Sequence, residues 1–316
     1  MKKFTSVEDI SDVNSWVQQA LQVKQQPFAH RHLGSNKTLG LLFFNPSLRT
    51  RMSTQKAAQH LGMQVIVLNL NSDGWKIELE DGTVMDQGTQ EHIKEAAAVL
   101  SQYCDILGVR TFPSLEDREK DYADQVLNKF VEHASVPVIS LESAILHPLQ
   151  SFADAMTIEE YKKKPRPKVV LSWAPHPRAL PQAVANSFVE WMSRTDVELV
   201  ITHPKGFELA PRFSRGIEVV YKQEAAFEGA DFIYAKNWSS YTDYGKIGKG
   251  LDQWMIDLDK MSRTNGAAFM HCLPVRRNVV VSDAVLDSDA SLVIQQANNR
   301  TFAAQTVLMN LLQHGA

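Results

Sequence analysis

Hydrophobic residues in this chain gather in short consecutive runs, and the stretches between them carry apolar residues at helical spacing. Consecutive apolar positions are typical of parallel strands that are buried on both faces. The strand candidates are 38–44, 64–69, 104–109, 136–140, 168–173, 197–202, 217–221, 231–235, 267–272 and 291–295. Helical spacing is clearest in 91–103 and 181–194. This alternation predicts an α/β fold with open, doubly wound parallel sheets and crossover helices.

The composition changes at YKKKPRPK (161–168), with four strand candidates before it and six after it. The pattern therefore predicts two open parallel-sheet domains joined by interdomain helices. We expect residues 1–146 to form the first domain, completed by a C-terminal helix in 299–316. Residues 147–298 form the second, with a linking helix at 147–160. Ligands of such folds bind outside the carboxyl ends of the strands, so polar residues after strands are the site candidates.

Bulk properties exclude several classes of protein. The 316 residues are 44% hydrophobic and 22% charged, as in ordinary globular proteins. The net charge of −3 indicates no nucleic-acid partner and no membrane partner. No apolar run reaches the roughly 18–20 residues of a bilayer span, and MKKFTSVEDISD turns acidic where an export signal would be apolar. With only two cysteines, we expect a cytoplasmic protein.

The segment FFNPSLRTR follows the first strand candidate and has the composition of an anion site. Pro46 suits the first position of a helix, and Asn45 or Ser47 can cap it. The free N–H groups and the dipole of a helix start favour an anion, and the forked guanidinium of Arg49 fits phosphate. The alternative is a surface turn with solvated arginines. A nucleotide site is disfavoured because neither G-x-G-x-x-G nor G-x-x-x-x-G-K occurs.

Three segments together resemble one known family. FFNPSLRTR resembles the carbamoyl-phosphate signature of the aspartate/ornithine carbamoyltransferases, with Leu48 where the family usually has Thr. HPLQSFAD (147–154) resembles the family's His-Pro-x-Gln segment, which read alone is a capped helix start, and FMHCLPVRR (269–277) resembles its ornithine-side His-Cys-Leu-Pro motif. The resemblance implies attack of a neutral amine on carbamoyl phosphate, with no metal and no organic cofactor.

The resemblance also implies the roles of individual residues. The catalytic set is Arg49, Thr50, Arg110 and His147. The carbamoyl-phosphate ligands are Ser47, Leu48, Arg49, Thr50, Trp75, Arg110, His147, Gln150, Cys272, Leu273 and Arg300. Thr50, Arg110 and His147 would stabilise the oxyanion. The attacking alkylamine, with a pKa of roughly 10, must lose a proton. No general base is evident, so we hypothesise that the departing phosphate accepts it.

The sequence differs from the ornithine and aspartate enzymes of the family, and these differences limit the choice of second substrate. The chain lacks the Ser-Met-Gly tripeptide of the ornithine enzymes, and its Leu48, Trp75 and Lys236-Asn237-Trp238 resemble the N-acylornithine carbamoyltransferases. HPLQSFAD and WAPHPR resemble those that use N-succinylornithine. The implied function is transfer of the carbamoyl group to the δ-amine of N-succinyl-L-ornithine in arginine biosynthesis. The implied acylornithine ligands are Glu142, His176, Lys236, Arg276 and Gln90.

Alternatives remain open for the substrate and for single residues. Gln90 stands where the succinyl enzymes have Pro and the acetyl enzymes have Glu; its neutral amide favours succinyl, and N-acetyl-L-ornithine is the alternative. Lys236 and His176 can also be read as solvated loop residues. Trp75 is either a core residue or, on the family pattern, part of a loop that reaches a neighbouring subunit of a homotrimer. A non-catalytic carbamoyl-phosphate-binding or regulatory protein is disfavoured by the complete ligand set.

Overall fold

The computed structural model describes residues 1–314, and the chain divides into two compact units. Unit 1 comprises Met1–Pro113, Glu119–Leu149 and the chain from Arg300 onward. Unit 2 comprises Ser114–Arg118 and Gln150–Asn299. The chain passes from one unit to the other on either side of Ser114–Arg118, and again within the helices α6 (Pro148–Tyr161) and α12 (Val293–His314). Each unit is therefore built from segments that are distant in sequence.

Unit 1 contains a five-stranded sheet in the order β1-β7-β6-β2-β3, and every pairing in it is parallel. The strands are β1 (Lys3–Phe4), β2 (Thr38–Phe43), β3 (Gln64–Asn69), β6 (Ile106–Arg110) and β7 (Val138–Glu142). The four longer strands confirm the four predicted apolar runs. Strand β1 was not predicted, because two residues are too few to carry a hydrophobic pattern. A further parallel pair joins β4 (Ile77–Glu78) to β5 (Glu91–His92).

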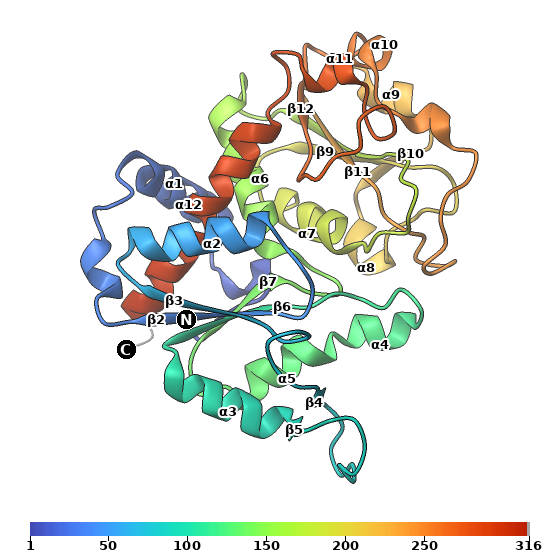
Figure 1. Cartoon of the computed structure of the whole chain (residues 1–316). Coiled ribbons are helices and arrows are strands. Elements are labelled where there is room, and N and C mark those ends of the chain that lie inside the picture. Colours follow the sequence, from blue (N-terminus) through green and yellow to red (C-terminus); the bar gives the residue numbers. More distant parts are fainter. Residues whose placement is uncertain (315–316) are drawn as a thin grey trace. The chain divides into compact units, whose positions relative to one another are not determined.

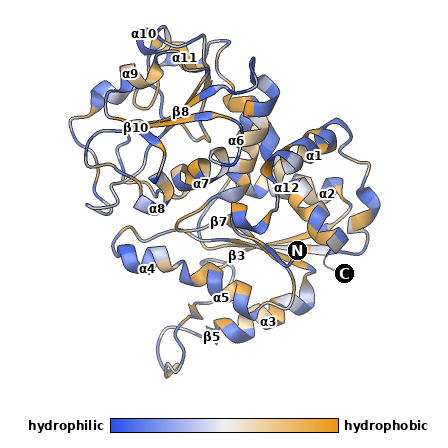
Figure 2. Ribbon diagram, turned by 180° about the vertical axis from the view of Figure 1, so that it is seen from behind, coloured by the Kyte–Doolittle hydropathy of each residue, from blue (hydrophilic) through white to orange (hydrophobic). Residues whose placement is uncertain are grey.

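Helices cover both faces of the unit 1 sheet. They are α1 (Val13–Gln25), α2 (Arg49–His60), α3 (Ile93–Tyr103), α4 (Arg118–Ala123) and α5 (Gln125–His133), with short 3-10 turns at Val7–Asp9 and Arg31–Gly34. Figure 1 shows α1 and α2 on one face and α3 and α5 on the other. Helices α3 and α5 carry both apolar and polar residues (Figure 2), as expected for helices with one face on a core. This layering confirms the doubly wound fold class.

Unit 2 repeats this architecture with the sheet order β10-β9-β8-β11-β12, again parallel throughout. Its strands are β8 (Lys168–Trp173), β9 (Glu198–Thr202), β10 (Glu218–Val220), β11 (Phe232–Lys236) and β12 (Ala268–Met270). Its helices are α7 (Ala183–Met192), α8 (Pro211–Ser214), α9 (Gln223–Phe227), α10 (Leu258–Met261) and α11 (Asp283–Leu286), with a 3-10 turn at Asp252–Trp254. Figure 1 shows α7 and α8 on one face and α9, α10 and α11 on the other.

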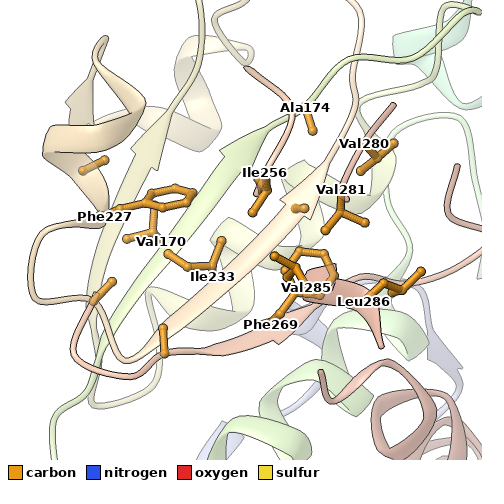
Figure 3. Close-up of a cluster of buried hydrophobic side chains, with 14 of the residues drawn as sticks. Val170, Ala174, Phe227, Ile233, Ile256, Phe269, Val280, Val281, Val285 and Leu286 are labelled. Carbon is orange, nitrogen blue, oxygen red and sulfur yellow. The ribbon is translucent and has the colours of Figure 1, made fainter. Parts of the chain in front are cut away.

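One core layer of unit 2 lies between the sheet and helices α9 and α11. Figure 3 shows Val170 and Ile233 from the central strands beside Phe227, Phe269 and Val285. All five are at most 1% exposed. Full burial of such side chains contributes roughly 1.5–3 kcal/mol each. This packing fixes the strands whose carboxyl ends carry the polar residues described below.

The predicted strand at 291–295 is wrong. Ser291 makes only an isolated bridge to Phe269, and α12 begins at Val293. A short apolar run cannot be distinguished from a buried helix segment by its pattern alone. The buried Val293 is the first residue of a 22-residue helix, and the buried Leu292 directly precedes it. This helix is also longer than the predicted terminal helix.

Among the helices of residues 1–314, none is both long enough and apolar enough to cross a bilayer.

Candidate active site

Strands of unit 1 end in polar residues, as the sequence predicted. Strand β6 ends at Arg110 and β7 ends at Glu142, and β2 leads through residues 44–48 into α2. Because β2, β6 and β7 are parallel neighbours, their carboxyl ends meet at the same edge of the sheet. The ends of β6 and β7 and the segment after β2 therefore lie close together.

Arg110 ties these three segments to one another. Its Nη2 donates to Glu142 Oε2 at 2.6 Å, and its Nη1 donates to the carbonyl oxygens of Asn45 and Pro46, each at 3.1 Å. The side chains of Arg110 and Glu142 are both 9% exposed. His147 Nε2 lies 3.8 Å from Glu142 Oε2. The result is a buried ion pair with a histidine beside it. The same arginine holds the loop after β2 in place through two of the loop's carbonyl groups.

Helix α2 begins later than the sequence suggested. Its first residue is Arg49, and Leu48 precedes it as an N-cap residue whose side chain makes no capping hydrogen bond. The predictions that Pro46 opens the helix and that Asn45 or Ser47 caps it are wrong. The carbonyl groups of residues 45 and 46 are used by Arg110 instead, which keeps this part of the loop outside the helix. The first turn thus offers its backbone N–H groups, and the positive end of the dipole, to a ligand.

Thr50 and Arg300 meet although they are 250 positions apart in the chain. Arg300 Nη2, on α12, donates to Thr50 Oγ1 at 2.5 Å, and the two residues are 5% and 2% exposed. Because a hydroxyl accepts this bond, its own proton remains available for donation in another direction. Two sequence candidates from opposite ends of the chain therefore belong to one buried cluster.

The segment of residues 71–92, which contains β4 and β5, lies at the surface. Trp75 is 55% exposed, so its reading as a core residue is wrong, and its Nε1 donates to Glu91 Oε2 at 2.7 Å. Gln90 is exposed, and its Oε1 accepts from the Lys76 backbone N–H at 3.2 Å. Leu48 is also exposed. Trp75 and Gln90 are thus held by local bonds while much of their surface is uncovered.

Asp81 anchors this exposed segment to two helices. Its carboxylate lies 2.6 Å from Lys94 Nζ on α3 and 3.0 Å from Lys129 Nζ on α5. The hydrogen bonds from Lys94 and then Lys129 lower the pKa of Asp81 to about 2. The segment therefore carries a charge-assisted attachment at neutral pH, although each exposed ion pair contributes little.

In unit 2, a cationic cluster forms after three neighbouring strands. His176 follows β8, Lys236 ends β11 and Arg276 follows β12. Arg276 Nε donates to His176 Nε2 at 3.2 Å. A neutral imidazole that accepts there carries its proton on Nδ1, which lies 2.9 Å from the Arg178 carbonyl oxygen. Partial burial lowers the pKa of His176, and the nearby cations Lys236, Arg276 and Arg178 lower it further.

Arg178 was missed in the sequence reasoning. It is exposed and stands two residues after His176 in APHPR, and this second cation in a loop after a strand was the available signal. With Arg178 included, the cluster presents three cations around one neutral ring. It is suited to carboxylate ligands.

The remaining sequence candidates lie on α6 and in the segment after β12. Helix α6 starts at Pro148, as predicted, and places buried Gln150 in its first turn, three residues after the buried His147. Leu273 has φ 53°, and its N–H donates to His271 Nδ1 at 2.9 Å. A left-handed conformation is costly for a non-glycine residue, and such residues concentrate at functional sites. Cys272 is partly buried beside it and is not part of a disulfide bond.

Comparison with known proteins places this geometry in context. Two family models match the chain: "Aspartate/ornithine carbamoyltransferase, carbamoyl-P binding domain" over residues 2–160, and "Aspartate/ornithine carbamoyltransferase, Asp/Orn binding domain" over residues 181–311. N-succinylornithine carbamoyltransferase of Bacteroides fragilis is 55% identical over 316 residues, covering 99% of both chains. N-acetylornithine carbamoyltransferase of Xanthomonas campestris is 36% identical, covering 99% of this chain and 98% of the relative.

Solved structures of N-acylornithine enzymes are also similar to this chain. The crystal structure of acetylornithine transcarbamylase complexed with acetylcitrulline has a TM-score of 0.94 and 36% identity, and covers 98% of this chain and 99% of that one. A single-residue mutant of N-acetyl-L-ornithine transcarbamylase, complexed with carbamyl phosphate and N-succinyl-L-norvaline, has a TM-score of 0.93 at 36% identity, and covers 98% of this chain and 100% of that one.

Proposed function

The chain belongs to the aspartate/ornithine carbamoyltransferase family, and we propose that this carbamoyltransferase acts on N-succinyl-L-ornithine. It moves the carbamoyl group of carbamoyl phosphate to the δ-amine, giving N-succinyl-L-citrulline and phosphate. The reaction is a step of arginine biosynthesis in the cytoplasm. No metal or organic cofactor takes part in it.

The cationic cluster of unit 2 is the observation that carries the choice of acyl group. N-succinylornithine has two carboxylates, whereas N-acetylornithine has one. Arg276 donates to the ring of His176, and Lys236 and Arg178 lie near enough to lower its pKa as Arg276 does. A second carboxylate is more favourable beside such a cluster than a methyl group is, because each charge-assisted bond adds attraction. The 55% identity to N-succinylornithine enzymes, against 36% to N-acetylornithine enzymes, supports the same substrate.

Carbamoyl phosphate is held at the start of α2. The phosphate accepts from Ser47, from Arg49 and from the backbone N–H groups of the first turn, where the helix dipole favours an anion. The Thr50 hydroxyl, fixed by Arg300, donates to a ligand oxygen. The further ligands are Leu48, Trp75, Gln150, Cys272 and Leu273. These contacts orient the carbonyl carbon for attack.

Positioning and electrostatics carry the chemistry. The neutral δ-amine, held by Glu142, attacks the carbonyl carbon and forms the new C–N bond. Arg110, His147 and Thr50 stabilise the charge that develops on the carbonyl oxygen. The C–O bond to phosphate then breaks, and the departing phosphate accepts the amine proton. A pH–rate profile that loses one enzyme-borne pKa in a single side-chain variant would contradict this last assignment.

The exposed segment around Trp75 serves a neighbouring subunit in a homotrimer. Its support is the 55% exposure of Trp75, which leaves a large aromatic surface uncovered in one chain. Aromatic side chains of this kind are common anchors at interfaces. Gln90 lies on the same segment and contacts the acyl group, where its neutral amide tolerates a succinyl carboxylate.

A parallel assay tests the proposal. The purified protein is supplied with carbamoyl phosphate and, in separate reactions, N-succinylornithine, N-acetylornithine, ornithine or aspartate, and the ureido product is measured. The highest kcat/KM is expected for N-succinylornithine. Highest activity with N-acetylornithine would replace the acyl assignment. No product with any amine would favour a protein that only binds carbamoyl phosphate.

A further inference from the structure

A buried polar network in unit 2 connects α6, α12 and the segment after β12. Gln150, Asp154 and Gln296 are each 0% exposed. Gln150 Nε2 donates to Asp154 Oδ1 at 2.8 Å, and Gln296 Nε2 donates to the same oxygen at 2.6 Å. Gln296 Oε1 accepts from the His271 backbone N–H at 2.9 Å. The proposed reaction assigns a role to Gln150 but none to Asp154 or Gln296.

One backbone group determines which atoms donate and which accept in this network. The His271 backbone N–H is a donor only, so the Gln296 atom that faces it is the oxygen. The Gln296 amide nitrogen therefore faces Asp154, whose carboxylate accepts. Since the same carboxylate oxygen also contacts Gln150, the nearer atom of Gln150 is its amide nitrogen. The orientation of the Gln150 amide is thus set from α12 through Asp154.

The buried Tyr234 lies beside the same network. Burial, with Asp154 and Cys272 as neighbours, raises the pKa of Tyr234 well above its usual value. The phenol therefore keeps its proton. Asp154 therefore has a neutral phenol as its neighbour, and its acceptor role is given by the bonds from Gln150 and Gln296.

We propose that Asp154 is the positioning residue for carbamoyl phosphate, and this inference rests on the function proposed above. By holding the Gln150 amide nitrogen, Asp154 directs Gln150 Oε1 towards the carbamoyl NH₂ group. Within residues 1–314 that oxygen is buried and has no hydrogen-bond partner. A buried acceptor without a partner is costly. The carbamoyl NH₂ group is a donor of the required kind, whereas an inverted Gln150 amide would oppose it with a second donor.

A double-mutant cycle on the full-length enzyme tests this inference. Asp154→Leu keeps the approximate size of the side chain and removes the acceptor. It is expected to raise the KM for carbamoyl phosphate by about tenfold, as for the loss of one positioned hydrogen bond, while the KM for N-succinylornithine stays within about twofold. In a Gln150→Ala background the same change is expected to alter the KM for carbamoyl phosphate by less than about twofold, because there is no amide left to orient.

Thr157→Val is the matched control. Thr157 lies about one turn further along α6, is equally buried, and accepts from Asn299 Nδ2 of α12 at 3.0 Å. Its replacement removes a polar link between the same two helices, and no change in either KM is expected. Asp154→Asn retains an acceptor oxygen for both glutamines and is expected to restore the KM for carbamoyl phosphate to within about threefold of wild type.

Gln150→Glu gives a second readout if Asp154→Leu does not fold. Two carboxyl groups in contact share a proton, so the new group keeps a proton that it donates to Asp154, and its carbonyl oxygen replaces Gln150 Oε1. The KM for carbamoyl phosphate should then rise with pH as this proton is lost. With Asp154→Asn added, the rise should move to lower pH.

The outcomes separate this inference from the proposed function. If the wild-type enzyme does not use carbamoyl phosphate, or if Gln150→Ala leaves its KM unchanged, the proposed function or its ligand set fails. If Gln150→Ala raises that KM but Asp154→Leu does not, or raises it equally in both backgrounds, only the positioning role of Asp154 is overturned. An unmoved pH dependence in the Gln150→Glu pair of variants overturns it as well.

Discussion

The buried pair of Arg110 and Glu142 allows a quantitative test of how unit 1 holds its site. The perturbations are Arg110→Met, Glu142→Gln and the two together. Arg110→Met removes the cation and leaves a carboxylate that is only 9% exposed. It also removes the two bonds to the carbonyl oxygens of residues 45 and 46. Glu142→Gln removes the charge but keeps an amide oxygen that can accept from Arg110.

The expected magnitudes follow from burial. Breaking a buried ion pair from one side costs about 3–5 kcal/mol, because the remaining charge stays uncompensated. At this exposure, solvent screening reduces that cost little. Glu142→Gln should cost about 1–3 kcal/mol, the typical cost of weakening a buried hydrogen bond to a charged group. The double variant has no buried charge, so it should be about 2 kcal/mol more stable than Arg110→Met alone.

The free energy of unfolding is best measured for unit 1 separately. Hydrogen exchange followed by mass spectrometry on peptides from β2, β6 and β7, at increasing urea, reports the opening free energy of that sheet. Protein concentration is kept fixed, since association would add to apparent stability. A double variant that is as unstable as Arg110→Met, or less stable, would refute the reasoning. The carboxylate would then not be the source of the cost.

Three further predictions concern substrate choice and assembly. Gln90→Glu should lower the ratio of kcat/KM for N-succinylornithine over N-acetylornithine by about fivefold, the effect of a repulsion of about 1 kcal/mol near the surface; an unchanged ratio would count against it. Lys236→Met should raise the KM for N-succinylornithine by at least about tenfold. NMR titration should place the pKa of His176 below 6.5 in the wild type. Because Lys236→Met removes a repelling cation, that pKa should rise in the variant, and an unchanged pKa would disprove the cluster. Mixing inactive Trp75→Ala and His147→Ala variants under subunit exchange should restore part of the activity if subunits share sites, and no recovery would oppose sharing.

The fold class was accessible from sequence because it rests on local patterns. Nine of the ten apolar runs became strands, since a strand buried on both faces needs consecutive apolar residues. The run at 291–295 failed because a few buried residues look alike in a strand and at the start of a buried helix. The strand-end positions of Arg110, Glu142 and Lys236 followed from the same reading.

Local helix-capping preferences did not predict the first residue of α2. Asn45 and Ser47 are good capping residues, and Pro46 is a good first helical residue. The helix nevertheless begins at Arg49, because Arg110, more than sixty positions away, takes the carbonyl groups of residues 45 and 46. Capping preferences describe a segment by itself and cannot include such a partner.

The sequence by itself determined the two parallel sheets, the strand ends that carry charge and the three motifs that indicate carbamoyl transfer. Only the tertiary structure decided what those residues contact. Thr50 meets Arg300 across 250 positions, and Asp154 meets Gln296 across 142. Hydrogen bonds depend on positions and directions that arise only when distant segments pack. For that reason Asp154, visible in HPLQSFAD four residues after Gln150, acquired a role only when the Gln296 amide and the His271 N–H were found beside it.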